Sequence, residues 1–168
     1  SIAGEKERGT LETLLTTAAS RVEILTAKHL GVLAIALFIT LLQGANLLVY
    51  AGFKLLPLPA GLAAAVTPGT VALLCFMYLP VAALVASGLL LISGYAKSYK
   101  EAQMYFMPAL LLGLVPAIVP FLPGISLRSV VALLPIANVA VAVKDILTGS
   151  FDWPLIVLAW LVTAGAAV

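Results

Sequence analysis

Residues 5–28 read EKERGTLETLLTTAASRVEILTAK, and residues 30–53 read LGVLAIALFITLLQGANLLVYAGF. Eight of the sixteen charged residues of the chain lie in the first stretch, and none lies in the second. As an α-helix, the 24 residues of the second stretch would extend about 36 Å, enough to cross a hydrocarbon layer of roughly 30 Å. We therefore predict a water-facing segment, residues 1–28, joined to a transmembrane domain, residues 29–168.

The composition of the whole chain agrees with this division. Hydrophobic residues make up 63% of the sequence and charged residues 10%, which is typical of a protein that crosses the membrane several times. The net charge of +2 is small, and no basic stripe interleaved with aromatic residues points to nucleic acid. The expected fold is all-α, a polytopic transmembrane helical bundle.

Further apolar runs follow the stretch at 30–53. Residues 69–93, 104–122 and 154–168 are predicted to cross the membrane, the last of them cut short by the end of the sequence. Residues 130–148 contain an apolar run that is too short to span and is interrupted by proline, so this segment is predicted to be a re-entrant or interfacial hairpin. Irregular backbone at that depth requires cover from protein, which places Asn138 inside the bundle.

The water-facing segment contains two helix-start signals. Thr10 can cap a short amphipathic helix whose apolar positions recur on one face, at Leu11, Leu14, Leu15 and Ala18. The sequence Ser20-Arg21-Val22-Glu23 has the form of a capping box and predicts a second helix beginning at Arg21. An ordinary juxtamembrane linker is the alternative interpretation of residues 1–28.

Basic residues are distributed unequally between the two sides of the predicted domain. Six of them fall in residues 1–28 and 94–103, whereas the opposite side has Lys54, Arg128 and Lys144. Because cytoplasmic loops carry the excess of lysine and arginine, both polar segments are predicted to be cytoplasmic in a cell-membrane protein.

Three amides are predicted to lie at membrane depth, where an unpaired polar group is costly. Gln43 and Asn46 are three residues apart and so share a helix face, and Asn138 lies in the re-entrant segment. Such residues either hydrogen-bond neighbouring helices or line a substrate path. Packing is the favoured role, and all three remain candidates for the path.

Residues typical of an enzyme site are absent from the sequence. It has no zinc-binding histidine pair, no glycine-rich phosphate loop with a lysine and no nucleophile elbow. We therefore predict no catalytic residue, no metal site and no cofactor bound by this chain, and the single cysteine, Cys75, is expected to be a packing residue.

The sequence resembles a known family, the type-two ABC transporter permeases. The cytoplasmic signature of that family is matched by Glu5 to Glu12, Leu14-Leu15, Ser20-Arg21, Glu23-Ile24-Leu25 and Lys28. Several further segments resemble the sodium-extrusion branch of that family. They are Lys100 to Gln103, Pro108, Pro116, Pro123-Gly124, Leu134 to Asn138 and Lys144 to Gly149. The first two spans of the family have no counterpart in this sequence, so the chain is expected to be a fragment. A second departure is Ala19, which stands where many members have a proline before the Ser-Arg pair.

The resemblance implies a permease subunit that pairs with a second permease, as a homo- or heterodimer, and with cytoplasmic ATP-binding subunits that hold ATP and magnesium. It further implies extrusion of sodium or another small solute. The amphipathic helix of residues 1–28 can insert into a groove of a soluble partner. The residues expected to dock and couple the ATPase are Glu5, Glu7, Arg8, Gly9, Thr10, Leu11, Glu12, Leu14 and Leu15.

Other functional classes remain alternatives at this stage. A non-transporting membrane scaffold could bind a soluble partner through residues 1–28, and an ion-coupled carrier or channel would need no ATP. An intramembrane protease is weaker, because the paired carboxylates and histidines that it requires are absent from this sequence.

Overall fold

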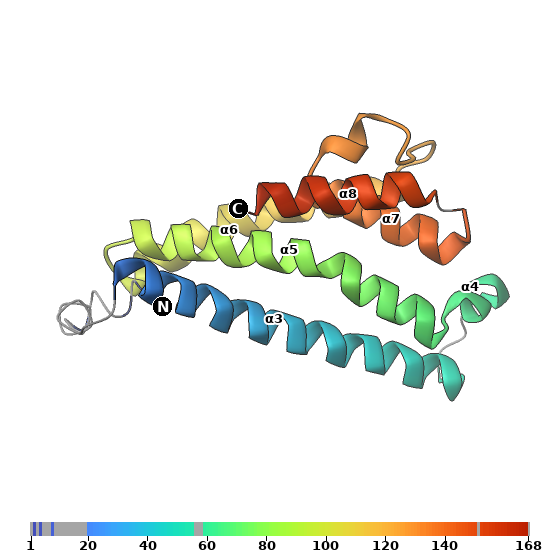
Figure 1. Cartoon of the computed structure of the whole chain (residues 1–168), viewed down its shortest axis with the longest axis horizontal. Coiled ribbons are helices and arrows are strands. Elements are labelled where there is room, and N and C mark those ends of the chain that lie inside the picture. Colours follow the sequence, from blue (N-terminus) through green and yellow to red (C-terminus); the bar gives the residue numbers. More distant parts are fainter. Residues whose placement is uncertain are drawn as a thin grey trace.

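The computed structural model describes Ile2, Gly4, Arg8 and residues 20–55, 59–150 and 152–167. All regular secondary structure in these ranges is helical (Figure 1). Three helices are long and apolar enough to cross a membrane, namely α3 (Arg21–Gly52), α5 (Pro68–Tyr95) and α6 (Tyr99–Ile118) with the turn that follows it. The all-α polytopic bundle predicted from the sequence is therefore confirmed.

Helix α3, Arg21–Gly52, begins where the capping box predicts. The Ser20 hydroxyl accepts a hydrogen bond from the Glu23 backbone N–H at 3.2 Å, and the Glu23 carboxylate accepts one from the Ser20 N–H at 2.7 Å. These two bonds satisfy backbone donors that a helix start leaves without partners. The 32 residues of α3 extend about 48 Å, so the helix is longer than the hydrocarbon layer is thick.

Helix α5, Pro68–Tyr95, packs along α3 and forms the middle of the bundle (Figure 1). It is capped by Thr67 and continues through Pro80, while the short helix α4, Ala60–Ala65, precedes it. Close packing of α3 on α5 depends on Gly44, because a Cβ atom there would lie 3.0 Å from both Cys75 Sγ and Val71 Cγ1. The absence of a side chain at this position therefore brings the two helices together.

We expect Gly44→Leu to destabilise the protein by about 2 kcal/mol, because a side chain would push α3 away from α5. Gly31→Leu is the matched control, since a Cβ at Gly31 on the same helix meets nothing within 4 Å. Thermal unfolding in detergent measures the difference. Equal unfolding temperatures for the two variants would show that the contact at Gly44 does not hold the helices together.

Helix α6, Tyr99–Ile118, begins five residues before the predicted run at 104 and continues into a 3-10 turn, η1, Val119–Phe121. The earlier start follows from Ser98, whose hydroxyl accepts from the Glu101 N–H at 3.2 Å, while the Glu101 carboxylate accepts from the Lys97 N–H at 2.8 Å. Half of the second polar segment is thus the first turn of a helix. Pro108 and Pro116 lie within α6 without ending it.

The segment between α6 and the last helix folds as a 3-10 helix, η2, Val130–Leu133, followed by α7, Ala137–Thr148. Ile136 joins them with φ of 69°, a left-handed conformation that is rare for a β-branched residue and turns the chain into α7. Helix α8, Trp153–Ala166, then packs on α5 and α7. The main core lies among α5, α7 and α8, around Met77, Val139, Val141 and Ile156.

The N-terminal end of α3 and the connection from α5 to α6 lie at the same end of the bundle and are neighbours there (Figure 1). One cavity at this end is lined by Leu25 and His29 from α3 and by Leu91 and Tyr95 from α5. Its lining also includes Ile2, which is buried.

Candidate functional site

The structure separates the three amides that the sequence singles out. Gln43 and Asn46 lie on α3 with exposed side chains, whereas Asn138 is fully buried at the start of α7. Gln43 lines a groove described below, and neither Asn46 nor Asn138 contributes to it. The three residues are therefore not assembled into one site by this chain.

Asn138 holds together three separate segments. Its Nδ2 donates to the carbonyl oxygens of Ala132 in η2 and Ala159 in α8, each at 3.1 Å. Its Oδ1 accepts from the Val139 N–H at 2.6 Å and from the Thr163 hydroxyl at 2.9 Å. These four bonds use the full capacity of an asparagine amide. The geometry thus favours the packing role of Asn138 over a place in a substrate path.

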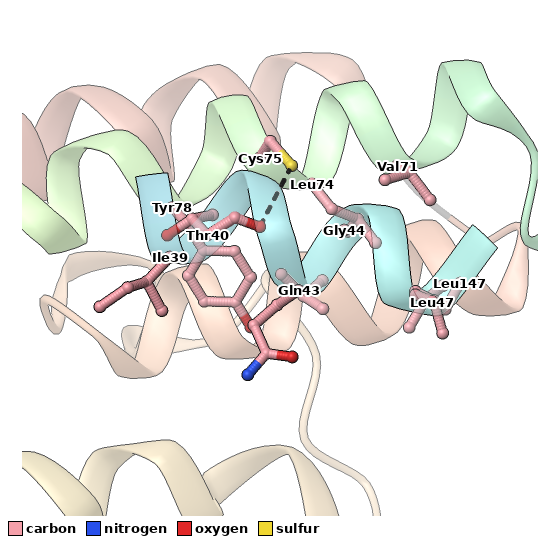
Figure 2. A pocket seen from close by; sticks show the side chains of 11 residues that line it. Ile39, Thr40, Gln43, Gly44, Leu47, Val71, Leu74, Cys75, Tyr78 and Leu147 are labelled. Carbon is pink, nitrogen blue, oxygen red and sulfur yellow. Dashed lines mark hydrogen bonds between the residues drawn. The ribbon is translucent and has the colours of Figure 1, made fainter. Parts of the chain in front are cut away.

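A groove between α3 and α5 includes Gln43, one of the predicted polar residues (Figure 2). We call it the α3–α5 groove, and its volume is about 420 Å³. Helix α7 closes one side of it through Val143 and Leu147. The remaining lining residues are Ile39, Thr40, Gln43, Gly44, Leu47, Val71, Leu74, Cys75 and Tyr78.

Two of the four polar side chains in the groove are already paired. The Thr40 hydroxyl donates to the Ala36 carbonyl at 2.9 Å, and the Cys75 thiol donates to the Thr40 carbonyl at 3.9 Å (Figure 2). The Gln43 amide and the Tyr78 hydroxyl have no hydrogen-bond partner among the described residues. Figure 2 shows the Gln43 side chain extending away from α5. The groove is thus apolar, with two available hydrogen-bonding groups.

Groups of acidic, histidine or cysteine side chains that could hold a metal ion do not occur in the described part of the chain. The family comparison supplies the decisive observation: the model of the ABC-2 family transporter proteins matches residues 1–168. The chain belongs to this family. No curated protein and no solved structure matches it.

ABC-2 family proteins are the membrane components of ABC transporters, and they associate with ATP-binding subunits and a partner permease. The family and the three long apolar helices together support a membrane location. The sequence resemblance to type-two ABC permeases is therefore confirmed at the level of the family.

The expected docking residues of this ABC-2 protein fall largely outside the part that the structure describes. Of the nine, only Arg8 is described; it is exposed, and its N–H donates to the Gly4 carbonyl at 3.2 Å. Those outside the described residues are Glu5, Glu7, Gly9, Thr10, Leu11, Glu12, Leu14 and Leu15.

Sequence reasoning did not find the α3–α5 groove. Cys75 was assigned to packing and Gly44 was not singled out, because apolar helices give no sign of which faces meet. The available signal was the pair of small residues that lets two helices approach closely, Gly44 on α3 and Cys75 on α5. Pairing them requires the tertiary structure, since they are separated by a loop and half of each helix.

Proposed function

We propose that this chain is the permease subunit of an ATP-driven exporter in which a partner subunit binds ATP and magnesium and hydrolyses the ATP. The observation that carries the proposal is the family match over residues 1–168. The three apolar helices of the bundle support it, because they are suited to form a path for solute but contain no nucleotide-binding loop. No cofactor is proposed on this chain.

Residues 1–28 are proposed to receive the force that ATP binding produces. In this mechanism the partner pushes a short amphipathic helix, and α3 carries the displacement into the bundle. The capping box at Ser20 supports the proposal, because it starts a continuous helix directly after this segment. A continuous helix transmits a displacement that a flexible connection would absorb. The extensive packing of α3 on α5 provides the route onward.

The cytoplasmic location of residues 1–28 and 94–103 is part of the same proposal. Its support is that the start of α3 and the connection from α5 to α6 lie at one end of the bundle, and that six of the nine basic residues belong to the two segments. A soluble ATPase at that end could contact both segments at once. Helix α6 starts in the second segment, so a contact there would act on another long helix.

Sodium is proposed as the exported solute on the resemblance to the sodium-extrusion branch. Asn46 is the proposed path residue, because its amide lies on an exposed face of a helix that is apolar enough to span. Gln43 lines the uncharged α3–α5 groove instead, where a sodium ion would find no counter-charge. Asn138 is assigned to packing instead, since its four hydrogen bonds leave it no capacity for a solute.

The test is reconstitution of the full-length permease with its ATP-binding partner in vesicles, with ATP hydrolysis and sodium flux measured together. We expect the permease to stimulate ATP hydrolysis and sodium to move only when ATP is present. Stimulated ATP hydrolysis without sodium movement would mean that the transporter exports another solute. A non-transporting scaffold would not stimulate ATP hydrolysis, and an ion-coupled carrier would move sodium without ATP.

A further inference from the structure

The α3–α5 groove has the size and position of a ligand site facing the membrane. Its volume of about 420 Å³ lies within the range of roughly 300–1,000 Å³ that small-molecule sites occupy. The α3 residues that line it, from Ile39 to Leu47, lie within the candidate span Val22–Gly52. A molecule in the groove would therefore sit at the depth of the lipid hydrocarbon.

The chemistry of the groove restricts the kind of molecule that it can hold. No charged side chain is among its lining residues, and Leu47, Val71, Leu74 and Leu147 make its surface apolar. An ion or a strongly hydrated solute would lose its water there without gaining a counter-charge. The apolar part of the ligand must therefore provide most of the contact.

Two polar groups at the groove are available to bind a hydrogen-bonding group of the ligand. The Gln43 amide and the Tyr78 hydroxyl come from different helices, line the same groove and lack partners among the described residues. A saturated acyl chain would leave both groups unpaired in hydrocarbon, which costs free energy. A ligand that carries a hydroxyl or amide beside its apolar body satisfies them.

We propose that the α3–α5 groove binds an uncharged amphiphile from the membrane, with its apolar body against α5 and α7 and its polar group held by Gln43 and Tyr78. This binding needs no ATP-binding partner and is independent of which solute the transporter exports. Cys75 provides a direct readout, because it lines the groove, is half-buried and is the only cysteine of the chain.

The experiment measures the rate at which N-ethylmaleimide alkylates Cys75 in the purified protein in lipid nanodiscs, followed by mass spectrometry. The two probes are 1-dodecanol and dodecane, which have the same chain but differ in the hydroxyl. We expect dodecanol to slow alkylation in a saturable manner and dodecane at the same mole fraction to have little effect. The concentration dependence gives the apparent affinity for dodecanol.

Matched variants then test the polar contacts. Gln43→Leu is expected to weaken dodecanol protection about tenfold, the effect of one hydrogen bond. Asn46→Leu makes the same chemical change one turn further along α3, outside the groove, and is expected to leave protection unchanged. Tyr78→Phe removes only the hydroxyl, so it should weaken protection without altering the packing of the ring.

Three results would overturn the proposal. Equal protection by the two probes would mean that the groove does not recognise a polar group. Full protection in Gln43→Leu and in Tyr78→Phe, with unfolding temperatures like the parent protein, would remove both residues from the site. Alkylation of Cys75 at the same rate with and without dodecanol would show that dodecanol does not enter the groove.

Discussion

Asn138→Leu is expected to lower the stability of the bundle by roughly 3 kcal/mol, because it leaves several buried polar groups without partners. Leucine is similar in size but cannot replace the hydrogen bonds to Ala132, Ala159 and Thr163. All of these bonds lie where the structure is closed to solvent, since Asn138 and Thr163 are both 0% exposed. Water therefore cannot take the place of the lost amide.

The measurement is thermal unfolding of the purified protein in detergent, with Asn46→Leu as the matched control. Asn46 is exposed on α3, so the same substitution there is expected to have little effect on stability. Thr163→Val should cost less than Asn138→Leu, because it removes a single hydrogen bond. In the double variant, part of the loss should be recovered, since the Thr163 hydroxyl is no longer left without an acceptor.

A stability of Asn138→Leu equal to that of the parent protein would contradict the role of this residue as the connection among η2, α7 and α8. Transport measurements on the same variant are informative only if it is still folded. Thr163→Val is the better variant for transport measurements, because it weakens the same hydrogen-bond network and leaves the Asn138 amide in place.

Leu14→Asp is expected to abolish ATP-driven transport by separating the permease from its ATP-binding partner. If Leu14 lies on the apolar face of an amphipathic helix, as the spacing of Leu11, Leu14, Leu15 and Ala18 predicts, a carboxylate there would be buried in the partner's groove. Truncation or charge at such an anchor position costs 2 kcal/mol or more, roughly a thirtyfold loss of affinity. Glu12→Lys is expected to act in the same direction through charge reversal.

Thr13→Asp is the matched control, because the same spacing places position 13 on the opposite face of that helix. It introduces the same charge one residue away and should preserve the complex. Association is measured by co-purification of the ATP-binding subunit, and membrane insertion by the yield of folded permease. Retention of the partner by both Leu14→Asp and Glu12→Lys would show that residues 1–28 are a linker and not a docking helix.

Much of the fold follows from local sequence signals. The capping box at Ser20 places the start of α3 correctly, and the apolar stretch that follows becomes a continuous helix. Helix α6 starts at Tyr99, five residues before the span predicted at 104–122, because that span was predicted from hydropathy alone. Ser98 and Glu101 are in fact a helix start, which shows that a cap within a charged segment is a stronger signal than the average polarity.

The candidate sites could be predicted only in part. The sequence analysis expected amides in an apolar segment to need partners, because hydrocarbon offers none, and Asn138 meets this expectation. Whether the protein supplies hydrogen-bond partners to a given amide depends on which helices pack around it. Asn138 obtains all four of its hydrogen bonds from distant and neighbouring segments, whereas Gln43 obtains none among the described residues for its amide.

The sequence by itself therefore determined that this protein is a bundle of apolar helices and where α3 begins, since hydropathy and capping act over a few residues. Only the tertiary structure decided that α3 meets α5 at Gly44, that a groove forms beside that contact, and that Asn138 connects η2, α7 and α8. The physical reason is that an apolar helix buries its surface equally well in lipid or against another helix. The close approach at small residues and the pairing of buried polar groups therefore select which faces meet.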